Sequence, residues 1–461
     1  MTRDTSFSSL PLPPPMQANL QQLGYLTMTP IQAASLPLAL AGQDLIAQAK
    51  TGSGKTAAFT LPLLMNLNPR RFAVQALVLC PTRELAEQVT QEVRRLARAE
   101  DNIKTLTLCG GAPIRNQLAS LAHGAHIVVG TPGRILDHLE RETLVLDALN
   151  TLVLDEADRM LDMGFAEDMA KVIEACPKAR QTLLFSATYP EGVAKLAARF
   201  MREPKEVKLT ERHAASKIRQ RFYEVTDSTR LHAVGQLLNH YRPVSTLAFC
   251  NTKQQCRDLV AVLQAQGIVA LELHGDLDQR ERDQVLVQFA NRSCSVLVAT
   301  DVAARGLDIA QLEAVINVDI TPDPEVHTHR VGRTGRADEA GWAFSLASMD
   351  EMGSVGRIDE MQGVASEWHR LSELTSPPNA EPLRPPMVTL QILGGRKEKI
   401  RPGDVLGALT KDMGFEGAQI GKINVNEFST YVAVERGVAD KVLRALNAGK
   451  VKGRSVKVRR L

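Results

Sequence analysis

The chain has 461 residues, of which 44% are hydrophobic and 23% charged, a composition typical of a folded protein with two to four domains. This composition excludes a chain that is disordered throughout, and no apolar run approaches the roughly 18 residues of a membrane-spanning helix. Residues 1–15 lack the apolar centre of a secretory signal, and the six cysteines include no CxxC pair. We therefore expect free thiols and a cytoplasmic protein that does not enter a membrane.

The net charge of +3 is unevenly distributed along the sequence. Residues 384–461 contain 16 Lys and Arg against 7 Asp and Glu, a balance of +9, whereas the residues before them contain 39 against 45, a balance of −6. A basic segment attached to a mildly acidic body indicates a polyanionic partner such as nucleic acid. The alternative is a lysine-rich face that is merely solvated.

Residues 43–318 alternate short apolar runs with longer stretches typical of helices. Continuous runs of Val, Ile and Leu predict strands covered by helices on both faces of a parallel sheet. The runs form two sets, and we therefore expect two tandem doubly wound α/β domains. The first set comprises residues 44–48, 76–80, 126–129, 151–154 and 182–185, and the second comprises residues 246–249, 269–273, 296–299 and 315–318.

A polar segment and a proline-rich segment interrupt this pattern and predict the domain boundaries. Beyond the prolines, we expect a small α+β domain with strands at residues 387–393, 420–425, 430–434 and 455–458 and helices at residues 403–413 and 438–448. The predicted organisation is a first domain over residues 1–208, a linker over 209–217, a second domain over 218–370, a proline-rich linker over 371–386 and the small domain over 387–461.

Residues 49–56 (AKTGSGKT) lie between a predicted strand and a predicted helix. In such a loop, glycines let backbone amides turn toward phosphate oxygens, and the helix N-terminus adds a favourable dipole. We expect Lys55 to reach the β- and γ-phosphates of ATP and Thr56 to ligate Mg²⁺. A glycine-rich surface loop is the alternative, but the strand–loop–helix context favours nucleotide binding. The expected phosphate-binding residues are Thr51, Gly52, Ser53, Gly54, Lys55 and Thr56.

The second motif is acidic and follows the predicted strand at residues 151–154. Asp155 is placed to hold Mg²⁺, and Glu156 to orient and deprotonate the attacking water. An acidic turn of this kind can also be a simple helix N-cap, but together with the phosphate loop it indicates a nucleotide-hydrolysis site.

The third motif, residues 329–336 (HRVGRTGR), lies in the second α/β domain. Arg333 and Arg336 are three residues apart, and their planar guanidinium groups suit the charge that develops on a transferred phosphoryl group. A basic face that binds RNA or a carboxylate is the alternative. On the functional interpretation, ATP hydrolysis requires the two domains to close. The expected catalytic residues are Lys55, Asp155, Glu156, Arg333 and Arg336.

Together these motifs resemble the DEAD-box ATP-dependent RNA helicases, and the resemblance spans residues 7–342. It implies two RecA-like domains that bind ATP and Mg²⁺. It also implies that Gln32 pairs with the adenine base, beside Tyr25 and Phe7, and that Gly306 and Asp308 form an ATP-side loop. Without the resemblance, Gln32 would be interpreted as a surface position of a helix and Phe7 as a core anchor.

The resemblance further implies that Ser186 and Thr188, with Asp158, couple hydrolysis to movement between the domains. It implies RNA-stimulated ATP hydrolysis with local unwinding of short duplexes. The alternative is an RNA-binding clamp or assembly scaffold with little unwinding, whereas a DNA helicase is disfavoured. The implied RNA contacts in the two domains are Pro81, Thr82, Arg83, Gly110, Gly111, Thr131, Pro132, Gly133, Arg134, Asn251, Thr252, Gln279, Arg282, Thr300 and Asp301.

The small basic domain, with residues 394–410 as its most characteristic stretch, resembles the C-terminal RNA-binding domain of the bacterial DbpA helicase subfamily, which is related to the RNA-recognition motif. The resemblance implies binding to a hairpin of 23S ribosomal RNA and a role in large-subunit assembly, and a monomer is the default expectation for the oligomeric state. Only Tyr431, with Phe428 before it, represents the usual stacking aromatics, so we expect contacts mainly to phosphates. The candidate side chains are Arg396, Lys397, Lys399, Lys422, Lys450, Lys452, Arg454, Lys457, Arg459 and Arg460.

Overall fold

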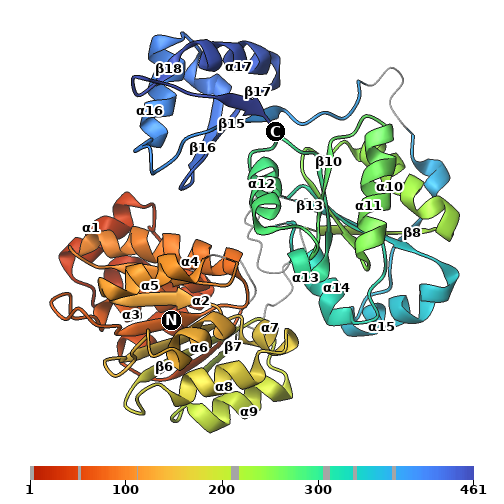
Figure 1. The fold of residues 1–461 in the computed structure, drawn as a ribbon. Helices are drawn as coiled ribbons and strands as arrows, with labels where there is room; N and C mark the ends of the chain where they lie inside the picture. Colours follow the sequence, from red (N-terminus) through yellow and green to blue (C-terminus); the bar gives the residue numbers. More distant parts are fainter. Residues whose placement is uncertain are drawn as a thin grey trace. The chain divides into compact units, whose positions relative to one another are not determined.

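The computed structural model describes residues 5–49, 53–111, 113–208, 218–304, 312–335, 340–375 and 381–461. These residues form two compact units, the first within residues 1–212 and the second within residues 213–461. Figure 1 shows a sheet flanked by helices in each unit and a smaller domain at the C-terminal end. Among the helices described, none is long and apolar enough to cross a membrane. All six cysteines are buried and free, as expected.

The first unit is built on a seven-stranded sheet with the order β3-β4-β2-β5-β6-β1-β7, and every pair of neighbours is parallel. Its side chains alternate between two hydrophobic clusters, so that Leu45 and Ala47 of β1 face one cluster and Ile46 faces the other. Helices α1–α4 contribute to the first cluster and α6–α9 to the second, which confirms a doubly wound domain. The strands are β1 (Leu45–Gln48), β2 (Ala76–Leu79), β3 (Thr105–Leu108), β4 (Ile127–Gly130), β5 (Thr151–Asp155), β6 (Gln181–Ser186) and β7 (Lys205–Lys208).

The helical segments of this unit are η1 (Phe7–Ser9), α1 (Pro14–Gln22), α2 (Pro30–Leu40), α3 (Lys55–Met65), α4 (Arg83–Leu96), η2 (Ala97–Ala99), α5 (Ile114–Ala122), α6 (Pro132–Glu140), α7 (Ala157–Asp162), α8 (Ala166–Glu174) and α9 (Glu191–Phe200). Three of them, η1, α1 and α2, precede β1, and the others lie between consecutive strands.

The second unit repeats this topology in a parallel sheet with the order β10-β11-β9-β12-β13-β8-β14, which matches the first sheet strand for strand. Two hydrophobic clusters again form, one with α10 and α11 and the other with α15. The strands are β8 (Ile218–Glu224), β9 (Thr246–Cys250), β10 (Ala270–Leu273), β11 (Val296–Thr300), β12 (Ala314–Asn317), β13 (Gly341–Ala347) and β14 (Trp368–His369). The helices are α10 (Asp227–Tyr241), α11 (Lys253–Ala265), α12 (Gln279–Ala290), α13 (Asp301–Ala304), α14 (Pro324–Val331), η3 (Met349–Glu351), α15 (Met352–Gln362) and η4 (Leu371–Glu373).

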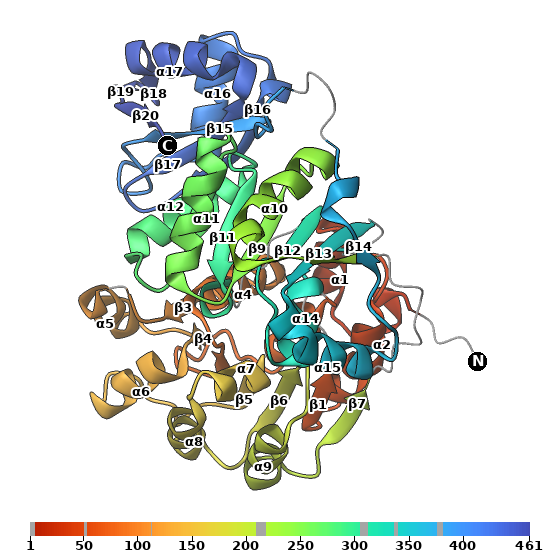
Figure 2. The same cartoon turned by 90° about the vertical axis from the view of Figure 1, so that its right-hand side faces the viewer.

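The small domain has an antiparallel sheet with the order β16-β17-β15-β20. Val388, Leu390 and Ile392 of β15 pack against α16 and α17, which cover one face of the sheet (Figure 2). Its elements are β15 (Met387–Ile392), α16 (Pro402–Gly407), η5 (Ala408–Asp412), η6 (Gly417–Gln419), β16 (Ile420–Val425), β17 (Thr430–Glu435), η7 (Arg436–Val438), α17 (Ala439–Ala448), β18 (Lys450–Val451), β19 (Arg454–Ser455) and β20 (Val458–Arg460).

Two details of this domain differ from the sequence prediction. The helix predicted over residues 403–413 is α-helical only in α16 and continues as the π-helical segment η5. The single strand predicted at residues 455–458 is wrong, since the chain forms the hairpin β18–β19 there and joins the sheet only at β20. The hairpin turns at Lys452 and Gly453, both of which have positive φ angles.

Candidate ATP site and RNA-contacting loops

The phosphate loop ends at Gly54, and α3 begins with Lys55, whose charged side chain is buried. Gly54 has a φ angle of 91° and a Cβ atom there would lie 2.5 Å from Nε2 of Gln32, so this position requires glycine. Lys55 follows it, is 6% exposed, and its Nζ has no hydrogen-bond partner among the residues described. Thr51 and Gly52, which we expect to bind phosphate, lie outside the described residues.

The acidic motif lies where β5 ends and α7 begins. Asp155 is buried, and its Oδ1 also has no partner among the residues that the structure describes. Burial raises the pKa of Asp155 to about 7, although the charge of Lys55 opposes this increase. Glu156 adopts a left-handed conformation (φ 54°), and its Oε2 accepts a hydrogen bond of 2.7 Å from Nη1 of the buried Arg159.

These groups fit ATP and Mg²⁺. Lys55 and Asp155 each bury a charged group that has no hydrogen bond to a described residue. Such burial costs folding free energy unless a charged ligand interacts with these groups. Carboxylate and hydroxyl oxygens are the ligands that Mg²⁺ prefers, and Asp155 and Thr56 offer one of each.

Asp158 joins α7 to the segment after β6. Its Oδ2 accepts hydrogen bonds from the amides of Ala187 (3.1 Å) and Thr188 (2.8 Å) and from the Thr188 hydroxyl (2.9 Å). Its amide in turn donates to Oγ of Ser186 (3.2 Å). Burial alone would raise the pKa of Asp158, but the Thr188 and Ser186 hydrogen bonds lower it below its ordinary value. The structure thus brings together the three residues expected to couple hydrolysis to domain movement.

The expected adenine-reading segment contacts the phosphate loop directly. Gln32 is buried rather than on a helix surface, and it forms a capping box with Thr29 at the start of α2. Its Nε2 also donates to the carbonyl of Gly54 (3.0 Å). Phe7 is a core residue, and its ring meets that of Tyr25 edge-on with centroids 5.7 Å apart.

The expected RNA contacts of the first unit follow the adjacent strands β2, β3 and β4. Because all three strands are parallel, their carboxyl ends place these loops along one edge of the sheet. Thr82 caps α4 by accepting a hydrogen bond from the Leu85 amide (3.2 Å). Arg134 donates to Oε1 of Gln117 (2.9 Å). The expected contacts at this edge are Pro81, Thr82, Arg83, Gly110, Gly111, Thr131, Pro132, Gly133 and Arg134.

In the second unit, one buried arginine that sequence reasoning did not select holds two of the expected RNA loops. Arg330 of α14 is 1% exposed and binds both carboxylate oxygens of Asp301, at 2.7 and 2.6 Å. It also donates to Oδ1 of Asn251 (2.9 Å) and to the carbonyl of Asp319 (2.7 Å). The loops after β9, β11 and β12 are therefore fixed to the helix that precedes Arg333.

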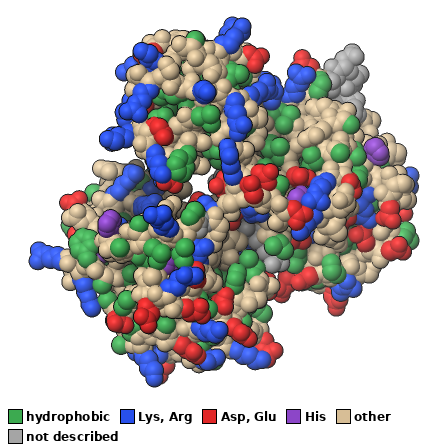
Figure 3. Space-filling view, in the orientation of Figure 1, with side chains coloured by type: hydrophobic (Ala, Val, Ile, Leu, Met, Phe, Trp, Pro, Cys, Tyr) green, Lys and Arg blue, Asp and Glu red, His purple; other side chains and the backbone are tan. Residues whose placement is uncertain are grey.

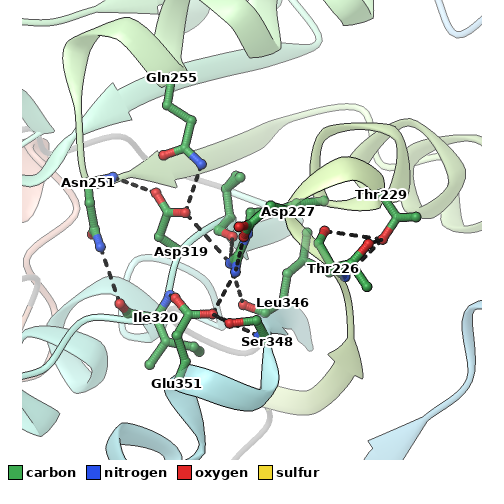
Figure 4. Close-up of polar contacts among 12 residues, drawn as sticks. Thr226, Asp227, Thr229, Asn251, Gln255, Asp319, Ile320, Leu346, Ser348 and Glu351 are labelled. Atoms are coloured by element: carbon green, nitrogen blue, oxygen red, sulfur yellow. Dashed lines mark hydrogen bonds and ion pairs between the residues drawn. The ribbon is translucent and has the colours of Figure 1, made fainter.

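A second buried arginine contacts the loop after β12 and Glu351 of η3, and Figure 4 shows the polar contacts around Asp319 and Glu351. Arg230 of α10 donates to Glu351 (2.7 Å) and to the carbonyl of Val318 (2.8 Å), and it lies 3.6 Å from Oδ1 of Asp319. The Asp319 carboxylate also accepts hydrogen bonds from the Asn251 amide and from Gln255, both at 2.8 Å. A charged residue directly after a buried strand was the one sequence signal for Asp319.

The remaining expected residues of the second unit are described in part. Thr252 caps α11, and Arg282 of α12 donates to the carbonyl of Ala303 in α13 (3.2 Å). Gln279 begins α12, Thr300 ends β11, and the buried Arg333 follows α14. Gly306, Asp308 and Arg336 lie outside the described residues.

In the small domain, Lys and Arg side chains are spread over the surface seen in Figure 3, and several of them belong to residues 395–399 and to the β18–β19 hairpin. Lys397 lies 3.4 Å from the Glu427 carboxylate, and Lys452 lies 3.5 Å from that of Asp404. Tyr431 is only 4% exposed, in keeping with the expectation that base stacking on the sheet face is not the main mode. The exposed candidates are Arg396, Lys397, Lys399, Lys422, Lys450, Lys452, Arg454, Lys457, Arg459 and Arg460.

Family comparisons agree with this geometry over nearly the whole chain. Residues 29–196 match the family model described as DEAD/DEAH box helicase, residues 229–338 match the helicase conserved C-terminal domain, and residues 389–460 match the DbpA RNA binding domain. The ATP-dependent RNA helicase DbpA of Escherichia coli is 53% identical over 99% of this chain and 100% of that protein. The chain belongs to the DEAD-box RNA helicases.

Two other DEAD-box helicases match over a smaller share of the chain. The helicase CshA of Geobacillus kaustophilus is 43% identical and covers 77% of this chain and 76% of its own length. A structure of Saccharomyces cerevisiae Dbp5 bound to RNA and ADP BeF3 covers 80% of this chain and 96% of that one, with a TM-score of 0.74 and 30% identity.

Proposed function

We propose that this DEAD-box helicase hydrolyses ATP in response to RNA and uses the cycle to open short RNA duplexes locally. The observation that carries the proposal is the pair of buried charged groups, Lys55 and Asp155, whose polar atoms have no hydrogen bond to the described residues. They lie beside Glu156, a carboxylate held in place by Arg159.

The proposed chemistry assigns a role to each expected site residue. Lys55 binds the β- and γ-phosphates, and Asp155 and Thr56 hold a Mg²⁺ ion that neutralises phosphate charge. Glu156 orients the attacking water and accepts its proton. Arg333 and Arg336 stabilise the charge on the transferred phosphoryl group. The adenosine contacts are Phe7, Tyr25, Gln32, Gly306 and Asp308.

Coupling to RNA rests on the Asp158 hydrogen bonds to Ser186 and Thr188 and on the braced loops of the second unit. RNA and ATP both favour the closed state, so that each increases the affinity for the other. The core contacts are mainly to the RNA backbone, which makes this part of the protein tolerant of sequence.

The small domain determines which RNA the protein binds. Residues 384–461 have a charge balance of +9, which attracts RNA phosphates at long range, and the resemblance of the small domain to the DbpA domain supports a hairpin of 23S ribosomal RNA as the target. We infer that the protein acts in the cytoplasm, as a monomer, on precursors of the large ribosomal subunit.

A strand-displacement assay separates this function from the alternative of an RNA clamp. The substrate is a short RNA duplex joined to the 23S hairpin, with ATP, with ADP or without nucleotide. The helicase proposal predicts displacement only with ATP, whereas a clamp binds the substrate in an ATP-dependent way and leaves the duplex intact.

A further inference from the structure

One aromatic ring of the small domain is largely exposed to solvent. Phe428 lies in the turn between β16 and β17 and is 59% exposed. The turn is closed by a hydrogen bond from the Asn426 amide to the Ser429 carbonyl (2.8 Å). More than half of the Phe428 surface is therefore open to a flat ligand, and the surrounding contacts, unlike those of other exposed rings, define what that ligand is.

The basic loop at residues 395–399 lies against this turn. The amide of Arg396 donates to the carbonyl of Asn426 (2.8 Å) and that of Lys397 donates to the carbonyl of Glu427 (3.1 Å). A Cβ atom on Gly395 would lie 2.3 Å from the Asn426 carbonyl oxygen, so glycine permits this close approach. The backbone therefore fixes the ring relative to the two basic residues.

The charge around the ring is mostly positive. Nζ of Lys397 lies 4.1 Å from the Phe428 ring centroid, a cation–π contact. The carbonyl of Lys457 accepts a hydrogen bond from the Leu393 amide (2.9 Å), which brings β20 to the same end of the sheet. Of the two carboxylates in these segments, that of Glu398 accepts the Gly395 amide (2.7 Å) and that of Glu427 lies beside Lys397.

We propose that Phe428 and Lys397 form a stacking site for one unpaired RNA base. The base packs on the exposed part of the phenylalanine ring, and the lysine contacts the phosphate next to it. An exposed ring beside an ammonium group fits a ligand that is both flat and anionic, which a nucleotide is. This site deepens the proposed function, since it rests on RNA binding by the small domain.

The site also explains how a domain related to the RNA-recognition motif stacks bases without the usual aromatics of its sheet face. Tyr431 is buried there, and its hydroxyl lies 3.4 Å from Nε2 of Gln391. Phe428, in the turn before β17, thus provides an exposed aromatic ring, whereas Tyr431 of the strand itself is buried.

The test measures binding of a fluorescently labelled RNA hairpin with an unpaired purine loop to the full chain. We expect Phe428→Ala to weaken binding by about tenfold, the effect of losing one stacked base. Phe428→Trp should bind like the unchanged protein, and the added tryptophan fluorescence should be quenched by the loop RNA but not by a blunt duplex. Phe72→Ala removes a ring of similar exposure (62%) from the first unit and should have no effect.

A Lys422→Gln/Arg454→Gln variant separates this site from the wider proposal. If Phe428→Ala binds normally while the charge variant binds weakly, the stacking site is wrong and RNA binding by the small domain stands. If neither variant changes the affinity, both proposals fail.

Discussion

The two parallel sheets have the same strand order and carry their functional side chains at the same edge, yet they treat buried charge differently. In the first unit, the buried Lys55 Nζ and Asp155 Oδ1 have no hydrogen-bond partner among the residues described. In the second unit, the buried Arg330 is bound to Asp301, Asn251 and Asp319. In the first unit, the buried charged groups are thus available to bind a charged ligand. In the second unit, the buried arginine instead holds the loops after the strands in place.

The largest effect should come from the general base of the first unit. Glu156→Gln keeps the size of the side chain and removes its basicity, so ATP turnover should fall by about 10²–10⁴-fold. ATP-dependent RNA binding should remain, because the phosphate loop and the RNA loops are unchanged. Steady-state ATPase and RNA-binding assays check both expectations, and an undiminished ATPase would remove Glu156 from this role.

The second unit should lose the most stability when its bound arginine is removed. Arg330→Met leaves the Asp301 carboxylate without its ion-pair partner, at an expected cost of about 3–5 kcal/mol. Chemical denaturation followed by a probe in the second unit measures this loss. Arg330→Lys restores the charge but not the bidentate geometry and should lie between the two. If Arg330→Met were as stable as the unchanged protein, the bracing role would be wrong.

The first unit should respond to charge removal in the opposite direction. The native pKa of Asp155 is about 7 and lies above its ordinary value of 3.8, so its stabilising contribution is present at low pH and is lost as the pH rises toward and through 7. Asp155→Asn should therefore raise stability at pH 8 in the ATP-free protein, by up to about 4 kcal/mol, although turnover is lost. Thermal unfolding between pH 5 and pH 8 measures this effect, with the exposed Asp147→Asn as control. A destabilised Asp155→Asn variant would contradict the account.

The smallest of the stability effects concerns a buried histidine of the second unit. His327 stacks on Phe222, and neither ring nitrogen has a hydrogen-bond partner among the described residues. Burial, together with the charge of Arg330, lowers its pKa from 6.5 to about 4. Because the native pKa is depressed, its contribution is present above pH 6.5 and is lost as the pH falls toward 4, by up to about 3 kcal/mol.

His327→Leu should make the second unit less sensitive to acid, whereas the exposed His232→Leu should leave the pH dependence unchanged. Unfolding at pH 5 and pH 7.5 distinguishes them. An equal acid sensitivity in all three proteins would assign the pH dependence of this unit to other groups.

The sequence predicted most of the interior strands because they are apolar and covered on both faces, but it missed β8 and β13 inside the second sheet and the edge strands β3, β7 and β14. Strand β7 buries only Val207, and β14 has two residues, so neither carries a continuous apolar run. The site loops were predictable because parallel strands place their carboxyl ends together. Arg230 was not, since its partner Glu351 lies 121 residues away and only folding brings the two together.

The rate of ATP hydrolysis by the full chain, with RNA that contains the 23S hairpin and with unrelated RNA of equal length, tests the central claim most directly. The account predicts strong stimulation by the hairpin RNA and weaker stimulation by the unrelated RNA at the same concentration. Equal stimulation by both RNAs would contradict the assignment of RNA selectivity to the small domain. No stimulation by either would contradict RNA-coupled hydrolysis itself.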